Sequence, residues 1–254
     1  PIQSYFFMSN DSSGFRQSYT VGAFDIDAFK RMTAPALLRV LNEVAMQHVL
    51  ALQLSVWDLE PHQIAWVLLR LEIRIHRLPE LGEELSIHTQ PSGFERVFTY
   101  RDYRVTDAEG KLIVDAATTW ALFNIESRRP TRIPSWIPER ISPLAAGEEP
   151  LPRPADKLPD WTTSDHQLRY TVGWHDLDFN WHLNNTHFLR LLLDSVPTAI
   201  LREKTPRLIR LHYKAEAALA DEVIAETAVL MDTHCLHQLR RGDHVLAQAE
   251  TVWE

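Results

Sequence analysis

The chain has 254 residues, of which 45% are hydrophobic and 24% are charged, so it can build one large domain or two small ones around a buried core. Its formal net charge of −8 argues against a nucleic-acid binder, and no apolar run of roughly 18 residues predicts a membrane span. The first residues show no secretory signal pattern, and the only cysteine, Cys235, excludes an internal disulfide framework. We therefore expect a soluble protein of a reducing compartment, the cytoplasm.

The first half begins with an irregular polar entry over residues 1–14, and a strand follows from Tyr19 to about Asp27. Thr33 can cap a helix that has Pro35 in its first turn, where the missing N–H costs nothing. One broad apolar stripe then recurs at helical spacing: Leu37, Leu38, Leu41, Val44, Ala45, His48, Val49 and Leu52. This stripe predicts an amphipathic helix of roughly five turns, with a core or pocket-lining histidine in it.

A β pattern covers residues 63–123, with strands expected over 66–77, 84–90, 96–106 and 111–123. One helix followed by four antiparallel strands predicts a sheet wrapped around the helix. Residues 130–159 then hold eight of the fifteen prolines, a density that favours extended chain. We interpret this region as the connection between two halves, and expect domains over 1–136 and 164–254 with a linker over 137–163.

The second half repeats the first. Residues 19–41 and 170–192 align without a gap at an offset of 151, and nine of the 23 pairs are identical. The same element order follows, with strands expected near 207–217, 221–232, 234–241 and 244–253. Two copies of one strand–helix–sheet unit indicate a duplicated fold.

The most informative stretch is 174–197, where polar residues occur at every second position: Asp176, Asp178, Asn180, His182 and Asn184. On extended chain this spacing would point all five side chains the same way. A helical spacing follows from Phe188 to Ala199, and Asn184 or Asn185 is a good N-cap for that helix. A carboxylate, an amide and an imidazole beside a helix N-terminus suit a reaction that develops an oxyanion.

The repeat serves as an internal control on this stretch. The second copy has Asn180, His182, Asn184 and Asn185 where the first has Phe29, Arg31, Thr33 and Ala34. Both copies keep the two aspartates, so Asp176 and Asp178 can be partly structural. We therefore expect the chemistry in the second half, where the residues that differ can do acid–base or amide chemistry.

The segment 176–185, Asp-Leu-Asp-Phe-Asn-Trp-His-Leu-Asn-Asn, resembles the catalytic segment of the acyl-(acyl carrier protein) thioesterases, a plant-type family with bacterial relatives. Residues 66–70, 79–83, 120–124 and 127–134 also resemble that family, as does Tyr213-Lys214-Ala215-Glu216-Ala217. The resemblance covers nearly the whole chain. It implies an α+β tandem double hot-dog fold, in which each half is a long helix wrapped by an antiparallel β-sheet.

The resemblance places the catalytic roles on Asp178, Asn180, His182 and Glu216. Ala217 stands where plant members carry cysteine, so a Cys–His mechanism is not expected, and Trp181 stands where glutamine is usual. Strand alternation groups Glu216 with Leu208 and His212, and its counterpart in the first repeat would be about His76.

The chemistry of thioester hydrolysis leaves several routes open. Asn180 can orient substrate or water, and the helix start at 184–186 can hold the carbonyl oxygen. His182 or Glu216 can take a proton from water, with Asp178 fixing orientation, or a carboxylate can attack directly. A metal bound by His175, Asp176, Asp178, His182 and His187 is the weaker alternative, because no ligand set has metal-site spacing. No Gly-x-Ser-x-Gly elbow is present, and we expect no cofactor and no metal.

The family resemblance also implies a substrate and a partner. We expect release of a free fatty acid from acyl carrier protein, ending fatty acid synthesis, in a bacterial cytoplasm. Asn184 and Asn185 are expected to contact substrate, and the first half to hold the acyl chain, with walls from Met32, Leu38, Leu41, Ala45 and His48. An acyl-CoA thioesterase of the same fold and a non-catalytic acyl-binding sensor are the alternatives.

Two basic clusters are candidate docking sites for the acidic carrier protein. One comprises Arg202, Lys204, Arg207 and Arg210, and the other Arg128, Arg129 and Arg132. Acyl chain length and saturation, the assembly of two copies into a homodimer, and the choice between carrier protein and CoA are left open by the sequence.

Overall fold

The computed structural model describes residues 14–141, 147–231 and 233–254. Residues 1–13 of the predicted irregular entry and residues 142–146 of the predicted linker lie outside the described residues. The chain forms two compact units. The first contains the described parts of Pro1–Thr33, Arg39–Leu69 and His76–Arg153, and the second contains Ala34–Leu38, Arg70–Ile75 and the described part of Pro154–Glu254.

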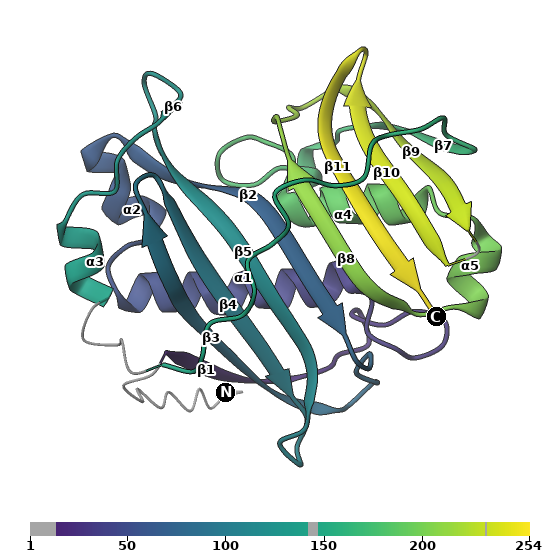
Figure 1. Ribbon diagram of the computed structural model, residues 1–254, viewed down its shortest axis with the longest axis horizontal. Helices are drawn as coiled ribbons and strands as arrows, with labels where there is room; N and C mark the ends of the chain where they lie inside the picture. Colours follow the sequence, from purple (N-terminus) through teal and green to yellow (C-terminus); the bar gives the residue numbers. More distant parts are fainter. Residues whose placement is uncertain (1–13, 142–146, 232) are drawn as a thin grey trace. The chain divides into compact units, whose positions relative to one another are not determined.

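The first half of the chain forms an antiparallel sheet with helix α1 (Ala34–Ala51) along one face, shown in Figure 1. Its strand order is β1-β3-β4-β5-β2, and the short β6 pairs with β5. The strands are β1 (Phe15–Thr20), β2 (Ile64–Ile75), β3 (Glu84–Glu95), β4 (Phe98–Thr106), β5 (Leu112–Asn124) and β6 (Arg129–Pro130). Shorter helices are α2 (Val56–Leu59), η1 (Glu60–His62) and α3 (Trp136–Ile141).

The predicted stripe of α1 is buried against this sheet. Leu37, Leu41 and Val44 are at most 1% exposed, because three or four residues separate neighbours on one face of a helix. Arg39 and Glu43, on the other side of the helix, are exposed. The prediction of a long amphipathic helix is therefore confirmed.

The second unit has the same order of elements, and Figure 1 shows α4 (Asn185–Asp194) along one face of its sheet. The second half of β2 pairs with β8, Arg70 opposite His212 and Ile73 opposite Ile209, and the order continues β8-β11-β10-β9-β7. The remaining elements are β7 (His166–Thr171), η3 (Trp174–Asp176), α5 (Thr198–Glu203), β8 (Pro206–Tyr213), β9 (Glu222–Met231), β10 (His234–Arg241) and β11 (His244–Trp253). Each half is thus a helix on an antiparallel sheet, the predicted hot-dog fold.

Three predicted elements end earlier than expected. The first strand stops at Thr20, because Asp25 then accepts a hydrogen bond from the Gly22 amide and turns the chain. The strand predicted over 207–217 stops at Tyr213. The second helix stops at Asp194 and a separate helix begins after Pro197, which cannot continue the ladder of a helix.

The proline-rich connection is held on the strands by polar contacts. In the first unit, Gln90 Nε2 donates to Glu148 O at 2.7 Å, and Leu151 N donates to Asp102 Oδ2 at 2.8 Å. In the second unit, His212 Nε2 lies 2.9 Å from Ala155 O. Among the helices of the described residues, none is long and apolar enough to cross a membrane.

Candidate active site

A buried aspartate anchors the loop before the helix in each repeat. In the second unit, Asp176 Oδ2 accepts hydrogen bonds from Tyr170 Oη and Gly173 N, both at 2.8 Å, and Arg190 donates to Oδ1 at 3.2 Å. Burial alone would raise the pKa of Asp176, but the hydrogen bonds from Gly173 and Tyr170 and the nearby charges hold it below its usual value.

The first unit reproduces this anchor with the residues 151 positions earlier. Asp25 Oδ2 accepts from Tyr19 Oη at 2.6 Å and from Gly22 N at 2.8 Å, and Arg39 contacts Oδ1. The first aspartate of the repeated pair is therefore structural, as the internal comparison predicted.

A second aspartate closes a tight turn. Asp178 Oδ1 accepts from the amides of Asn180 at 2.8 Å and His182 at 3.3 Å. Asp178 N donates to His182 O at 2.8 Å, and Trp181 has a left-handed backbone with φ of 66°. Asp27 closes the same turn in the first unit, where the left-handed residue is Lys30 with φ of 65°.

This turn overturns the prediction that five polar side chains share one direction. The chain reverses between Leu177 and Leu183, which form an antiparallel bridge, so the period-two spacing does not lie on a straight strand. Asp176 is buried, whereas Asn180 is exposed at the tip. The aspartate carboxylates accept hydrogen bonds from nearby backbone amides, and these local hydrogen bonds bend the chain.

The turn presents His182 to Glu216. The imidazole Nε2 is in contact with Glu216 Oε2, and the two side chains are 38% and 43% exposed, so the pair is open to solvent or substrate. Backbone pairing of His182 with Ala218, and a 2.8 Å hydrogen bond from Leu183 N to Ala217 O, hold the two segments together. The structure thus brings together two residues that are 34 positions apart in the chain.

Glu216 lies beyond the end of β8 and not on it, so the predicted alternation with Leu208 and His212 is wrong. Its counterpart in the first repeat is also not His76. Met32 N donates to Pro79 O there, as Leu183 N does to Ala217 O, which aligns Leu78 with Glu216. The first repeat therefore has Arg31 and Leu78 where the second has the histidine–glutamate pair.

The start of α4 is capped by Asn184, one of the two predicted caps. Asn184 Oδ1 accepts from Thr186 N at 3.0 Å, and His187 N donates to Asn184 O at 2.9 Å. Two amides of the first turn are thus already bonded, so the helix start is less suited to a carbonyl oxygen than the sequence suggested. Tyr213 Oη donates to Asn185 O at 3.1 Å and fixes this helix start to β8.

Three aromatic or titratable groups near the turn were given no catalytic role from the sequence. His187 Nδ1 lies 2.9 Å from Asp176 Oδ1 but is not aligned for a hydrogen bond, and burial followed by Arg190 lowers the pKa of His187. Trp174 and Trp181 stack edge to face at 5.3 Å and are 58% and 64% exposed. Their counterparts in the first repeat, Ala23 and Lys30, are the signal in the sequence that would have found them.

The predicted acyl-chain walls are buried in the interior. Met32, Leu38 and Leu41 are at most 1% exposed, and Ala45 is 8% exposed. His48 stacks on Phe15 at 5.5 Å, and its Nδ1 lies 3.0 Å from Arg101. Burial, followed by the charges of Arg101 and His88, lowers the pKa of His48 to about 3, so this histidine is neutral.

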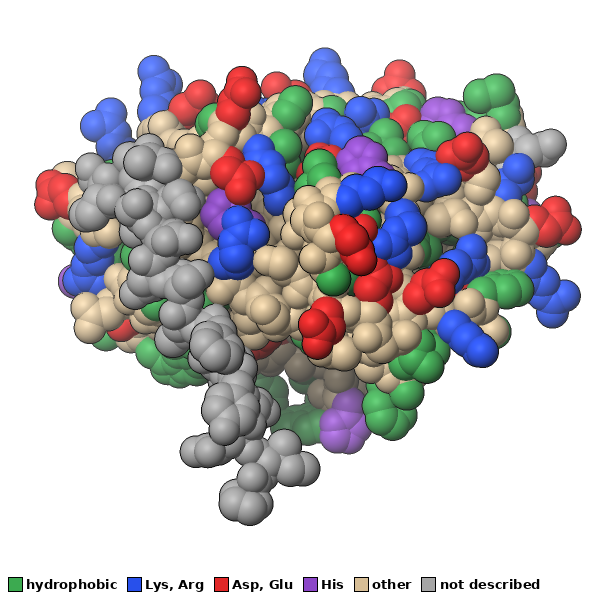
Figure 2. Space-filling view, turned by 90° about the horizontal axis from the view of Figure 1, so that it is seen from below, with side chains coloured by type: hydrophobic (Ala, Val, Ile, Leu, Met, Phe, Trp, Pro, Cys, Tyr) green, Lys and Arg blue, Asp and Glu red, His purple; other side chains and the backbone are tan. Residues whose placement is uncertain are grey.

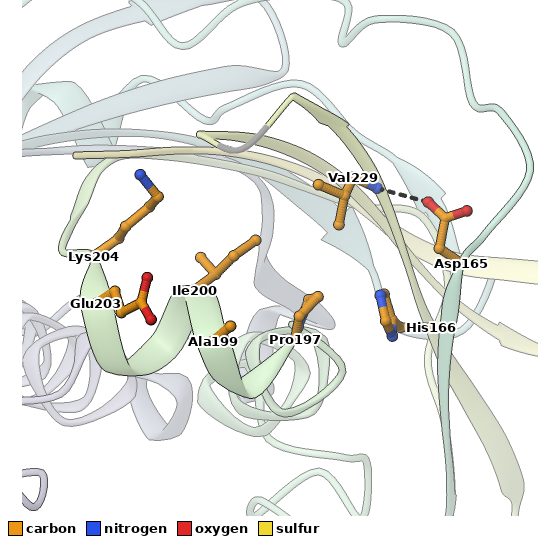
Figure 3. Close-up of a pocket in the computed structure, with 8 residues that line it drawn as sticks. All are labelled: Asp165, His166, Pro197, Ala199, Ile200, Glu203, Lys204 and Val229. Carbon is orange, nitrogen blue, oxygen red and sulfur yellow. Dashed lines mark hydrogen bonds between the residues drawn. The ribbon is translucent and has the colours of Figure 1, made fainter.

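One pocket in the second unit lies apart from these residues. It has a volume of about 480 Å³ and lies between α5 and the edge of the sheet, as Figure 3 shows. Ile200 and Val229 line it, and Asp165 accepts a hydrogen bond from the Val229 amide at 3.1 Å. None of its lining residues is a predicted site residue. Within the described ranges, no group of three or more His, Cys, Asp or Glu side chains is placed to hold a metal ion.

The repeated turn allows a matched test of Asp178. Replacing Asp178 or Asp27 with alanine removes equivalent hydrogen bonds, so each should destabilise folding by about 1–2 kcal/mol in urea unfolding. Only Asp178→Ala should also lower the rate of the thioester hydrolysis expected from the sequence, by roughly 10-fold or more, because only that turn carries His182. Equal activity of the two variants would contradict a positioning role for Asp178.

Comparison with known proteins matches both halves of the chain. Residues 12–141 match the acyl-ACP thioesterase N-terminal domain, and residues 160–254 match the acyl-ACP thioesterase C-terminal domain. A chloroplastic acyl-[acyl-carrier-protein] hydrolase of Cuphea viscosissima is 26% identical over 94% of this chain and 58% of its own length. A chloroplastic palmitoyl-acyl carrier protein thioesterase of Arabidopsis thaliana is 25% identical over 96% of this chain and 64% of its own length.

Two solved structures share the fold over nearly the whole chain. An acyl-ACP thioesterase from Bacteroides thetaiotaomicron has a TM-score of 0.85 at 24% identity, covering 94% of this chain and 97% of its own. The 12:0-ACP thioesterase from Umbellularia californica has a TM-score of 0.86 at 20% identity, covering 94% and 96%. The chain spans about three fifths of the length of the curated plant relatives it matches. By the match of both domains, the chain belongs to the acyl-ACP thioesterase family.

Proposed function

We propose that this protein hydrolyses the thioester of fatty acyl-acyl carrier protein and releases a free fatty acid. The contact between His182 and Glu216 carries this proposal, since an imidazole and a carboxylate in contact can together accept a proton from water. The first repeat has neither group, so the fold does not require them. The family match and the names of the relatives supply the substrate class.

In the proposed reaction, a water next to the pair attacks the thioester carbonyl carbon and gives its proton to the His182–Glu216 pair. The exposed Asn180 amide donates a hydrogen bond to the carbonyl oxygen as negative charge develops. The tetrahedral intermediate then collapses and expels the thiolate, which takes the proton back from the pair. Asp178 contributes by holding the turn, through the amides of Asn180 and His182.

The deciding experiment compares acyl-carrier-protein and acyl-CoA substrates side by side. Faster hydrolysis of the carrier-protein thioester supports the proposal, and faster hydrolysis of acyl-CoA supports the alternative thioesterase. Acyl binding with neither hydrolysis would identify a non-catalytic sensor instead. Chelator treatment belongs in the same assay, and we expect no loss of activity.

We also propose that the first half of the chain holds the acyl chain, along the face of α1 that carries Leu38, Leu41 and Ala45. The support is their burial in an apolar interior, which suits a hydrocarbon chain. Residence in a bacterial cytoplasm stays a prediction from the sequence, as does substrate contact by Asn185, and assembly into a homodimer stays open.

The docking surface for the acidic carrier protein is expected at Arg128, Arg129 and Arg132. All three are exposed. In the other basic cluster, carboxylates offset the positive charge, because Arg207 pairs with Glu254 at 2.6 Å and Arg210 pairs with Glu72 and Glu250, both at 3.0 Å. Acidic and basic side chains are interspersed on the face in Figure 2, so a net positive patch has to be local.

Reversing the charge of Arg128, Arg129 and Arg132 should raise KM for acyl carrier protein substrates several-fold and weaken its salt dependence. Hydrolysis of acyl-CoA, which brings no carrier protein, should stay unchanged. Arg202→Glu is the matched control from the other cluster. A larger KM effect from that control than from the triple variant would move the docking surface to α5.

A further inference from the structure

The interior of the first unit contains a buried cation with no anionic partner. Arg101 is 8% exposed, and its Nη1 contacts His48 Nδ1 at 3.0 Å and Thr89 Oγ1 at 3.1 Å. No carboxylate among the described residues forms an ion pair with it. Asp102 is the carboxylate whose charge acts on the pKa of Arg101, but its oxygens accept hydrogen bonds from Ser92 Oγ and Leu151 N and not from Arg101. Burying an uncompensated charge is costly, because water no longer solvates it.

A buried phenol beside this cation lacks a hydrogen-bond partner. Tyr103 is 1% exposed, and its Oη has no partner among the described residues. Burial raises the pKa of Tyr103 to about 12, although Arg101 and the Thr118 hydroxyl act in the opposite direction. That hydroxyl donates its own hydrogen to Arg101 O at 3.0 Å. Arg101 and Tyr103 are two residues apart on β4, so both side chains point to the face that α1 covers.

The second unit shows that the fold needs neither group. Thr89 pairs with Tyr103 across β3 and β4 as Thr227 pairs with His237 across β9 and β10. In the same way, Arg101 lies opposite Thr118 across β4 and β5, and Cys235 lies opposite Thr251 across β10 and β11. The two threonines correspond further, because Trp120 donates a hydrogen bond to the Thr118 hydroxyl and Trp253 donates one to the Thr251 hydroxyl.

At the matching positions, therefore, the second unit has a neutral cysteine for the arginine and a fully bonded histidine for the tyrosine. His237 Nδ1 lies 2.8 Å from Thr227 Oγ1, and Nε2 lies 2.8 Å from Thr251 Oγ1. The unpaired cation and the unpartnered phenol occur only in the half of the chain proposed to hold the acyl chain.

We infer that Arg101 and Tyr103 recognise an oxygen-bearing group at the far end of the acyl chain, a carboxylate in preference to a hydroxyl. This inference rests on the proposed function. In the apolar stripe of α1, His48 follows Leu41 and Ala45 and lies about 10 Å from Leu41 along the helix axis. A terminal carboxylate there would neutralise the guanidinium and accept the phenol hydrogen, whereas a methyl group would leave both unmatched.

The test uses carrier-protein thioesters of equal chain length that end in a methyl, a hydroxyl or a carboxylate group, each at several lengths. The wild type is expected to hydrolyse the carboxylate-ended chain with the highest kcat/KM at its preferred length. Arg101→Met should lower that value on the order of 100-fold and leave the methyl-ended chain unchanged or faster. Arg101→Lys keeps the charge and should restore part of the preference.

Tyr103→Phe is the sharper variant, because the phenol bonds to nothing in the free protein. Its loss should not lower the melting temperature, yet it should cost roughly 10-fold in kcat/KM for the carboxylate-ended chain alone. Binding can also be measured without catalysis. Free dicarboxylic acids should raise the melting temperature of the wild type more than monocarboxylic acids of equal length.

A wild type that prefers methyl-ended chains at every length, with no effect of Tyr103→Phe, would overturn the inference and leave the proposed function intact. Absence of hydrolysis with any thioester would instead defeat the proposed function. Selective stabilisation by dicarboxylic acids would still support the site in that case.

Discussion

Replacing His182 with alanine is expected to lower kcat/KM for acyl carrier protein thioesters on the order of 100-fold or more, with little change in melting temperature. The side chain contacts Glu216 and is 38% exposed, so its removal leaves no cavity in the core. The rate falls because the pair that takes the proton from water is lost. Steady-state hydrolysis and thermal unfolding measure the two effects on the same preparations.

Glu216→Gln should cause a loss of similar size, and the double variant should be little worse than either single one, because the two groups act as a unit. Ala217→Cys is the neighbouring control and should change little. Attack of the Glu216 carboxylate on the thioester would instead give an anhydride, and in single turnover in water enriched in heavy oxygen, opening of that anhydride at the glutamate carbonyl would place label in Glu216. Full activity of Glu216→Gln would leave His182 as the only base and remove the glutamate from the site.

Unfolding is expected to become easier as the pH falls from about 6.5, because the second unit buries a neutral histidine. Burial, followed by the charge of His234, lowers the pKa of His237 to about 3, while an unfolded histidine titrates near 6.5. Between these values the unfolded chain binds a proton that the folded chain excludes. The stability contributed by the neutral ring is therefore full above pH 6.5 and is lost progressively below it, on the order of several kcal/mol in total.

Urea unfolding at a series of pH values between about 6.5 and 5.5 measures this effect above the range where most carboxylates titrate. His237→Gln should flatten the slope by up to about 1.4 kcal/mol per pH unit, whatever its effect on absolute stability. His244→Gln is the matched control, because His244 is exposed on the neighbouring strand. An unchanged slope in His237→Gln would show that this histidine is not the group that resists protonation.

Periodicity alone predicted most of the fold. Buried positions on a helix recur every three or four residues, and the stripe from Leu37 to Val44 is buried as that spacing requires. The gapless repeat with its two aspartates predicted a duplicated unit, and both copies make the same anchor at Asp25 and Asp176. The helix stripe and the aspartate anchors depend mainly on residues that are close together in the chain, so they could be predicted without knowledge of the tertiary structure.

The candidate site was predicted by residue type and family motif, but its arrangement was not. The spacing of Asp178 and His182 fits a strand and a turn equally well. The turn forms because the backbone amides of Asn180 and His182 donate hydrogen bonds to the Asp178 carboxylate. The proximity of His182 to Glu216 depends on a bridge between distant segments, which no local pattern encodes.

The sequence by itself determined the family, the duplicated helix-and-sheet architecture and the half that carries the acid–base residues, because each depends on motif, repeat or period. Only the tertiary structure decided that Asn184 serves as a cap, that Leu78 and not His76 matches Glu216, and that Arg101 lies beside Tyr103 in the core. Strand register and the packing of a helix on a sheet set these outcomes, and both depend on contacts between residues far apart in the chain.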